Sequence, residues 1–175
     1  MTAEQEFDEF AVAAWPRLRR SAYLLTGDHH LAEDLAQTAL ARTYASWRRV
    51  RRADALAYAR KVLVNANIDR IRRRRATELG GVAADVALAT RAESGRGSAE
   101  IATDRDEIVR LLAGLTERER RVVVLRHYFD LSEAEVAGEL GIAPGTVKSA
   151  LSRALRKLRV AAADDETTFV RQGLR

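Results

Sequence analysis

One stretch near the C-terminus, LSEAEVAGELGIAPGTVKSALSRALRKLR (residues 131–159), most constrains how this chain can fold. Ser132 and Glu135 form the Ser-x-x-Glu pattern of a capping box, which satisfies two free backbone donors and starts a helix. Gly141 can adopt the left-handed conformation that ends this helix. Pro144 suits the first turn of a second helix, where a missing N–H does no harm. The stretch therefore predicts two short helices joined by a tight turn.

The second of these helices has two unlike sides. Its apolar residues recur at helical spacing, and we expect them to face the core: Val147, Leu151, Leu155 and Leu158. Residues 144–159 also hold five basic residues and no acidic one. A helix with a basic, small-residue outer side can enter the major groove of DNA. A solvated basic hairpin is the plainer alternative, but the capping box, the turn and the sign of the charge together favour a DNA-binding helix-turn-helix.

Charge is distributed unevenly along the 175 residues. Residues 48–75 hold eleven basic residues against two acidic, whereas residues 76–107 hold seven acidic against three basic. The net charge of +5 favours a polyanionic partner. The acidic block is also rich in glycine and alanine. It therefore predicts a flexible linker over residues 77–102, with at most a transient helical turn near residues 82–89.

Helical periodicity extends through much of the remaining chain. We expect helices over residues 6–25, with a break or kink at Pro16, over 29–47 after a cap at Asp28, and over 55–75 after a basic loop. A second unit begins near Asp104, and Thr116 with Glu119 forms another capping box. Residues 122–125 alone could pass for a strand. The prediction is an all-α chain with a domain at residues 1–76, the linker, a helix-turn-helix domain at 103–160 and an unassigned tail at 161–175.

The sequence argues against several other classes of protein. It has no cysteine, which excludes disulfides and thiolate metal sites and is compatible with a reducing cytoplasm. It shows no signal-peptide pattern and no run of about 20 apolar residues that could span a membrane. His29, His30 and His127 belong to no metal-binding pattern, and there is no nucleophile motif or phosphate-binding glycine loop. We therefore expect no metal, no cofactor and no enzymatic activity.

Three segments in fixed order resemble one protein family. They are AEDLAQTALARTYASW (residues 32–47), VNANIDRIRRRR (residues 64–75) and the helix-turn-helix. Together with the short chain length, they resemble the extracytoplasmic-function sigma factors of bacterial RNA polymerase, which carry only a promoter-melting domain (region 2) and a helix-turn-helix domain (region 4). The resemblance implies an initiation factor that binds core RNA polymerase, recognises −35 and −10 promoter elements and promotes DNA melting. The implied partners are promoter DNA, the clamp helices of the largest polymerase subunit, the flap region of the second-largest subunit and, commonly in the family, an anti-sigma factor.

The resemblance also implies roles for individual residues. The positions that match the surface docking on the clamp helices are Asp34, Leu35, Gln37, Leu40 and Trp47. The positions that match contacts to the −10 element and its phosphates are Arg48, Arg49, Arg51, Arg52, Asp54, Tyr58, Arg60, Lys61, Asn65, Asn67, Arg72, Arg73 and Arg74. The positions that match contacts to the −35 element are Arg118, Thr146, Lys148, Ser149, Ser152, Arg153 and Arg156. Ala150 stands where relatives often carry arginine, so the resemblance implies that one DNA contact is missing there. Tyr58 stands where many relatives carry tryptophan, which implies weaker stacking.

A helix-turn-helix regulator that binds duplex DNA without polymerase is the competing interpretation, because many regulators carry a similar C-terminal unit. Such proteins normally pair this unit with a ligand-binding or receiver domain. Residues 1–75 are too short and too rich in arginine for either. The sequence therefore favours the sigma factor, and co-purification with core polymerase would separate the two interpretations.

Overall fold

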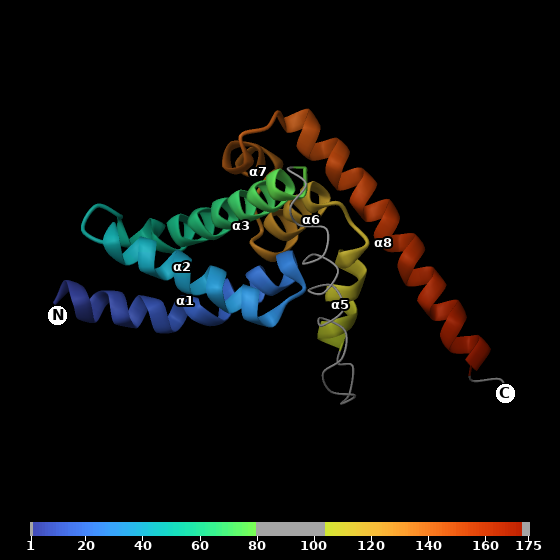
Figure 1. The fold of residues 1–175 in the computed structure, drawn as a ribbon, viewed down its shortest axis with the longest axis horizontal. Coiled ribbons are helices and arrows are strands. Elements are labelled where there is room, and N and C mark those ends of the chain that lie inside the picture. Colours follow the sequence, from blue (N-terminus) through green and yellow to red (C-terminus); the bar gives the residue numbers. More distant parts are fainter. Residues whose placement is uncertain (1, 80–103, 173–175) are drawn as a thin grey trace. The chain divides into compact units, whose positions relative to one another are not determined.

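The computed structural model describes residues 2–79 and 104–172 of the chain. Within these ranges every regular element is helical and no strand is present, which confirms the predicted all-α fold. The chain divides into two compact units, Met1–Ile101 (unit 1) and Ala102–Arg175 (unit 2); Figure 1 shows their helices. Most of the predicted linker, including its expected helical turn, lies outside the described residues.

Unit 1 contains three long helices: α1 (Ala3–Thr26), α2 (His29–Ala45) and α3 (Ala55–Leu79). The α2 helix packs against both α1 and α3, around fully buried side chains that include Leu18, Ala22, Ala36 and Leu63. The turn between α1 and α2 follows the predicted chemistry. Gly27 ends α1 in the left-handed conformation (φ 70°), and Asp28 Oδ1 accepts a 2.9 Å hydrogen bond from the backbone N–H of Leu31. A short 3₁₀ helix, η1 (Arg52–Asp54), leads into α3.

Pro16 does not break α1 into two segments, which was one of the two outcomes that the sequence predicts. The helix runs from Ala3 to Thr26 with Pro16 inside it. A proline removes one backbone hydrogen bond, which here would have gone to the carbonyl of Val12. Pro16 is exposed and Val12 is 77% exposed, so water can reach that carbonyl. The helix tolerates proline here because the missing bond lies on its solvent side.

Unit 2 contains α5 (Asp104–Ala113), α6 (Glu117–Val123), a π-helical turn η2 (Val124–Tyr128), α7 (Glu133–Leu140) and α8 (Pro144–Gln172). Both predicted capping boxes are present, one at the start of α6 and one at the start of α7. Gly141 ends α7 with φ 64°, and Pro144 begins α8. The predicted helix-turn-helix is therefore confirmed as α7 and α8, and residues 122–125 are helical.

The α8 helix differs from the expectation in length and in its buried side. The first part of the tail, for which the sequence predicts no regular structure, continues α8 to Gln172. Val147, Ala150 and Ala154 are completely buried, whereas Leu151, Leu155 and Leu158 are only half-buried. Residues three and four apart share one side of a helix, as positions 147, 150 and 154 do. Small alanine side chains allow α8 to pack closely on α6 and α7, its main neighbours, and the leucines border this contact.

Candidate nucleic-acid interface

The outer side of α8 presents the side chains that the sequence assigned to the −35 element. Five of them are exposed and Thr146 is half-exposed; the five are Lys148, Ser149, Ser152, Arg153 and Arg156. The buried stripe of α8 fixes the opposite side of the helix against unit 2, so these polar side chains project away from the core. Arg118 is also exposed, on α6. The structure thus gathers most of this predicted set on one helix surface.

Ala150 does not belong to this outer surface. Its side chain is 0% exposed, and it forms part of the contact between α8 and the rest of unit 2. An arginine here would have to place a charged group among apolar side chains, which is costly unless the charge is paired. The interpretation of Ala150 as a missing DNA contact is therefore wrong, and alanine is explained by close helix packing.

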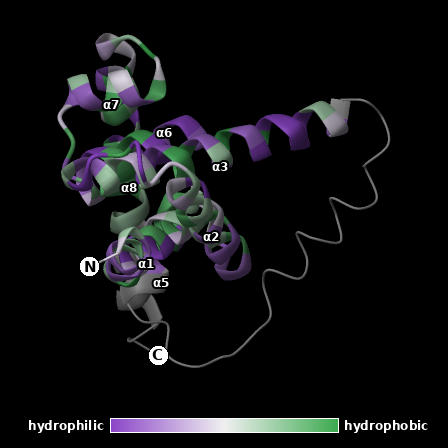
Figure 2. Cartoon of the chain, turned by 90° about the vertical axis from the view of Figure 1, so that its left-hand side faces the viewer, coloured by the Kyte–Doolittle hydropathy of each residue, from purple (hydrophilic) through white to green (hydrophobic). Residues whose placement is uncertain are grey.

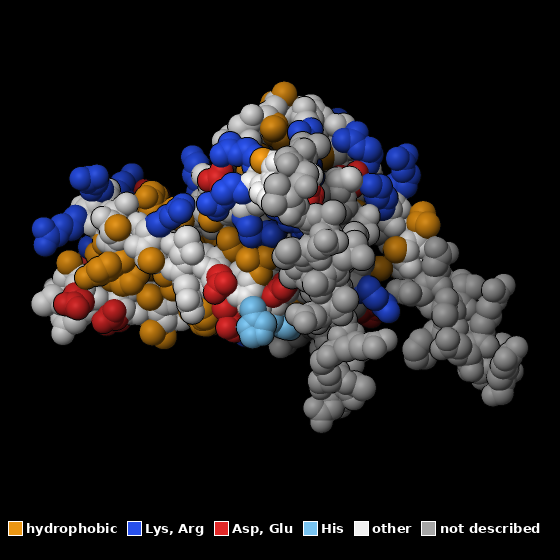
Figure 3. All heavy atoms as spheres, in the orientation of Figure 1, with side chains coloured by type: hydrophobic (Ala, Val, Ile, Leu, Met, Phe, Trp, Pro, Cys, Tyr) orange, Lys and Arg blue, Asp and Glu red, His pale blue; other side chains and the backbone are white. Residues whose placement is uncertain are grey.

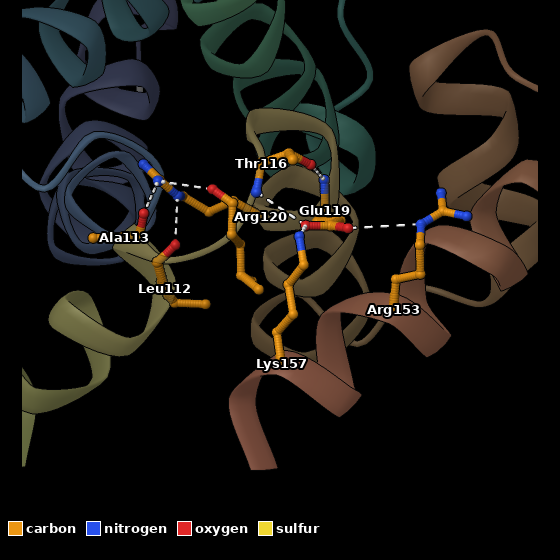
Figure 4. A network of polar contacts seen from close by, with 8 residues as sticks. Leu112, Ala113, Thr116, Glu119, Arg120, Arg153 and Lys157 are labelled. Atoms are coloured by element: carbon orange, nitrogen blue, oxygen red, sulfur yellow. Dashed lines mark hydrogen bonds and ion pairs between the residues drawn. The ribbon is translucent and has the colours of Figure 1, made fainter. Parts of the chain in front are cut away.

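A buried carboxylate connects α6 to the exposed side of α8 (Figure 4). Glu119 is 4% exposed and closes the capping box of α6, where its Oε2 accepts a 3.0 Å hydrogen bond from the backbone N–H of Thr116. The same oxygen accepts a 2.7 Å hydrogen bond from Lys157 Nζ, and Oε1 lies 3.6 Å from Arg153 Nε. The sequence identified Glu119 only as a capping residue, because its α8 partners are distant in the chain. The ion pair also means that Arg153 does not project freely into solvent.

The protonation of Glu119 is coupled to the stability of unit 2. Burial alone would raise the pKa of this carboxyl group, but hydrogen bonds from Lys157 and Thr116 outweigh burial and lower the pKa of Glu119 below its ordinary value of 4.5. A group with a lowered folded-state pKa stabilises the fold at pH values above its unfolded-state pKa. That contribution is lost as the pH falls through the folded-state value. We therefore expect the contribution of Glu119 to be complete at neutral pH and to decline below about pH 4.5.

Thermal unfolding between pH 7 and pH 3 tests this expectation. Both tryptophans, Trp15 and Trp47, lie in unit 1, so tryptophan fluorescence follows that unit while far-ultraviolet circular dichroism follows both. The Glu119→Gln variant lacks the titrating group, so the stability of unit 2 should fall less steeply with pH in this variant than in the wild type. Parallel pH profiles for the two proteins would contradict the expectation.

Arg120 holds α5 against α6. Its guanidinium donates hydrogen bonds to the backbone carbonyl oxygens of Leu112 (2.9 Å), Ala113 (3.2 Å) and Leu115 (3.3 Å), at and just beyond the end of α5. Burial lowers the pKa of Arg120 and the charge of Glu117 opposes this effect, but a guanidinium remains charged at neutral pH. This basic residue therefore serves the internal structure of unit 2, in contrast to exposed Arg118.

Trp47 lies in an aromatic cluster inside unit 1. Its side chain is 3% exposed, and its ring centroid lies 5.0 Å from that of Phe7 and 5.1 Å from that of Phe10. The guanidinium carbon of Arg52 lies 4.0 Å from the Trp47 ring centroid. A side chain this deeply buried cannot offer a binding surface. The prediction that Trp47 contacts polymerase directly is therefore wrong, and Trp47 is a core residue of unit 1.

Arg52 is held in the same part of unit 1. Its Nε donates a 2.8 Å hydrogen bond to Glu6 Oε2, and its Nη1 donates one of 2.8 Å to the backbone carbonyl oxygen of Trp47. The neighbouring Arg48, Arg49 and Arg51 are exposed, and Arg51 Nε lies 3.6 Å from the exposed Asp54. All four arginines of the predicted basic loop are therefore at the surface, and Arg52 also ties the loop to α1.

The α3 helix presents part of the set assigned to the −10 element. Lys61 and Asn65 are exposed, whereas Tyr58 and Arg60 are half-buried. The Tyr58 hydroxyl donates a 3.0 Å hydrogen bond to Ser46 Oγ.

Asn67 does not share the exposed side of α3. Its side chain is only 2% exposed, and its Oδ1 accepts a 3.2 Å hydrogen bond from Arg70. Positions 65 and 67 point to different sides, because two residues correspond to a rotation of about 200° around a helix. Asn67 is therefore a core residue, and the prediction that it contacts DNA is wrong.

The arginine run lies on the second half of α3, which is hydrophilic along most of its length (Figure 2). Arg72, Arg73 and Arg74 are all exposed. Arg72 pairs with Asp69 at 3.1 Å and Arg74 pairs with Glu78 at 2.8 Å; such exposed pairs stabilise a helix only slightly. Figure 3 shows how Lys and Arg side chains stand out from the described surface. The run is thus accessible to phosphate groups.

The α2 helix contributes both exposed and buried members of the predicted docking set. Asp34 and Gln37 are exposed and Leu40 is half-buried, whereas Leu35 is 6% exposed and belongs mainly to the core. A hollow between α2 and α3 is lined by Leu35, Thr38 and Arg42 on one side and by Asp69, Arg70 and Arg73 on the other. The predicted docking surface and the arginine run therefore adjoin each other.

No helix in the described part of the chain is long and apolar enough to cross a membrane. Among the side chains that the structure describes, those of residues 2–78 and 107–163, no group of three or more from His, Cys, Asp and Glu is placed to hold a metal ion.

Comparison with known proteins assigns the chain to a family. Residues 12–77 match the model of Sigma-70 region 2, and residues 105–158 match that of Sigma-70, region 4. The chain is 40% identical over 158 residues to the RNA polymerase sigma-E factor of Streptomyces coelicolor, covering 88% of this chain and 84% of the relative. It is 34% identical over 160 residues to the ECF RNA polymerase sigma factor SigL of Mycobacterium tuberculosis, covering 88% and 85%.

A solved structure shows the same fold. The sigma factor RpoE of Bartonella quintana, crystallised in complex with the anti-sigma factor NepR, matches with a TM-score of 0.67 and 24% identity, covering 89% of this chain and 95% of that one. Both sigma regions thus occur in order along this chain, and the two sigma factors compared above align with it over most of their length. The helical units described above accordingly place this chain among the extracytoplasmic-function sigma factors, the alternative transcription initiation factors of bacterial RNA polymerase.

Proposed function

We propose that unit 2 reads the −35 element with α8, while unit 1 contacts the −10 element and core RNA polymerase. The observation that carries this proposal is the outer side of α8, where exposed basic and small polar side chains stand opposite a completely buried stripe. A capped helix-turn-helix with such a surface fits the major groove. In this assignment Lys148, Ser149, Ser152 and Arg153 face base edges, and Arg118, Thr146 and Arg156 face phosphates. Promoter binding and melting then require no catalytic group of this chain.

Unit 1 supplies the surfaces for the −10 element and for polymerase. The exposed Arg48, Arg49, Arg51 and Lys61 suit phosphate contacts, and the run from Arg72 to Arg74 extends this basic surface. Asn65 and the half-exposed ring of Tyr58 suit an unpaired base. On α2, the exposed Asp34 and Gln37, bordered by Leu40, form the surface that we assign to the clamp helices of the largest polymerase subunit. Unit 2 would contact the flap region of the second-largest subunit.

Run-off transcription with purified core polymerase tests the proposed function. The chain should direct a specific transcript from a promoter that carries both elements, whereas core polymerase alone should not. Tight and specific binding to an operator by the chain alone, with no effect on core polymerase, would support the stand-alone regulator. The family expectations of an anti-sigma partner and of a location in the cytoplasm beside polymerase belong to this proposal, and co-purification with both proteins would test them.

Lys148→Ala should weaken recognition of the −35 element by about 1–3 kcal/mol if Lys148 contacts base edges. The fold should be unaffected, because Lys148 is exposed and its side chain makes no hydrogen bond or ion pair within the described residues. Holoenzyme affinity is measured on a promoter with the native −35 element and on one with a substituted element. Lys148→Arg retains the charge and serves as the matched control. Full activity of Lys148→Ala on a promoter that depends on the −35 element would exclude this residue as a reader.

Tyr58→Ala and Asn65→Ala should slow open-complex formation more than initial promoter binding. Unpaired bases become available only as melting begins, so contacts to them favour the open state; a stacked base contributes about 1–3 kcal/mol. Tyr58→Phe is the matched control, because it keeps the ring and loses only the hydrogen bond to Ser46. Rates are compared on a duplex promoter and on one pre-melted across the −10 element. A defect that persists unchanged on pre-melted DNA would contradict the assignment.

A further inference from the structure

We propose that Glu119 is a positioning residue for promoter recognition, and that its buried carboxylate sets the direction of the Arg153 guanidinium and thereby the base preference of α8. The inference rests on the proposed function, because it takes Arg153 as a reader of the −35 element. Glu119 itself is too buried to contact DNA, at 4% exposure. Its influence would pass through Arg153 alone.

The two oxygens of the Glu119 carboxylate have different partners. Oε2 accepts hydrogen bonds from the backbone N–H of Thr116 at 3.0 Å and from Lys157 Nζ at 2.7 Å. Oε1 faces Arg153 Nε at 3.6 Å. The capping box and Lys157 therefore lock the carboxylate in place, and the second oxygen is left to orient Arg153. A group that is itself held by packing and hydrogen bonds can hold another with little freedom of movement.

Glu119 contacts Arg153 through Nε, and this leaves the two terminal nitrogens of the guanidinium for base recognition. A guanidinium can form paired hydrogen bonds through its two terminal nitrogens, and this fork fits O6 and N7 of guanine. Figure 4 shows Arg153 Nε directed toward Glu119 and the terminal nitrogens directed away from it. Glu119 is the one partner of Arg153 among the described residues, and the Arg153 side chain is 49% exposed. The fork is thus held outward and remains available.

Such an arrangement favours specific binding for an entropic reason. A long arginine side chain on a helix surface samples many rotamers, and it loses this freedom when it binds a base. An arginine that is already directed outward loses less, so more of its interaction with the correct base appears as affinity. The sequence-independent attraction of its charge to phosphates would change little. Glu119 is therefore expected to affect the preference between promoters more than the strength of DNA binding in general.

The matched pair of variants is Glu119→Gln and Glu135→Gln. Glutamine serves in a capping box as glutamate does, so both variants keep the helix starts while each removes one charge. Glu135 occupies the same capping position in α7, where its Oε2 accepts hydrogen bonds from Ser132, but it is exposed. Holoenzyme affinity is measured on the native promoter and on promoters with single substitutions in the −35 element, and the ratio of the two affinities defines the preference.

Glu119→Gln should lower this preference about fivefold or more, in the range expected when one bidentate base contact is lost or misplaced. Glu135→Gln should stay within about twofold of the wild type, as expected for a charge that positions no base-reading group. In an Arg153→Ala background, Glu119→Gln should lower the preference no further, because the group that it positions is gone. Thermal unfolding of each variant is measured alongside, since a purely structural role would change stability and leave the preference unchanged.

Three results would overturn the proposal. The first is that Glu119→Gln folds and keeps the wild-type promoter preference, although Arg153→Ala loses that preference. The second is an equal effect of Glu119→Gln with and without Arg153. The third is an unchanged preference in Arg153→Ala, which would also remove Arg153 from the readers and so mark a failure of the proposed function itself. If Glu119→Gln does not fold, Glu119→Asp keeps the charge but withdraws it from Arg153, and it should lower the preference in the same way.

Discussion

Replacing Trp47 with alanine is expected to destabilise unit 1 by about 3–5 kcal/mol, the usual cost of truncating a large buried aromatic side chain. The indole contacts Phe7 and Phe10 and lies beneath the Arg52 guanidinium, so its loss removes several packing partners together. Because single domains are stabilised by only about 5–15 kcal/mol, much of unit 1 should unfold at physiological temperature. Urea denaturation followed by the fluorescence of Trp15, the second tryptophan of the chain, measures this change.

Asp34→Arg is the matched control for this prediction. Asp34 is exposed, so reversing its charge should leave the stability of unit 1 nearly unchanged and impair association with core polymerase. A pull-down with core polymerase beside circular dichroism distinguishes the two causes. If Trp47→Ala retained wild-type stability and lost only polymerase binding, Trp47 would be a contact residue and its assignment to the core would be wrong.

Replacing Arg72, Arg73 and Arg74 together with alanine should weaken initial promoter binding for every DNA sequence and flatten its dependence on salt. Each phosphate contact contributes about 0.7–0.9 to the slope of log affinity against log salt concentration, so losing three contacts should lower the slope by about 2–3. When these arginines bind phosphate, the exposed ion pairs of Arg72 with Asp69 and of Arg74 with Glu78 would break, and this loses little free energy. Alanine keeps the helix, because it has the highest helix propensity.

Holoenzyme binding between about 50 and 200 mM salt measures this slope. The triple lysine variant retains the charges and should restore most of it, which separates charge from shape. A promoter pre-melted across the −10 element should not rescue the alanine variant, in contrast to Tyr58→Ala. An unchanged slope would show that the arginine run does not contact phosphates.

The starts and ends of several helices could be predicted because their causes are local. Ser132 with Glu135 and Thr116 with Glu119 are three residues apart, and Gly27, Gly141 and Pro144 act through their own backbone. The family resemblance supplied a set of expected contact positions in the same segments. Neither source contains the information that decides whether a given side chain faces solvent, because that depends on what packs against it from elsewhere in the chain.

The errors have this common physical origin. Trp47 matches a position of a docking surface, but α1 brings Phe7 and Phe10 against it. Asn67 follows the exposed Asn65 by two positions and is therefore turned inward. Periodicity alone could not predict which side of α8 is buried, because alanines and leucines both recur at helical spacing around this helix. The structure shows that the buried side is centred on Ala150 and Ala154, where the helices pack closely. Lys157 reaches Glu119 across 38 residues, beyond the range of any local pattern.

The length of α8 has a geometric consequence. Its 29 residues form one helix, which at about 1.5 Å per residue spans about 43 Å. The α8 positions assigned to the −35 element, residues 146–156, lie within its first half, so the end near Gln172 stands about 24–39 Å from them along the axis. Because an unbroken helix tilts as one body over such a length, a small change in how α8 sits in the groove becomes a large displacement at its far end. A spectroscopic label near Gln172 would therefore serve as a pointer to the seating of α8 on DNA without altering any residue assigned to the DNA.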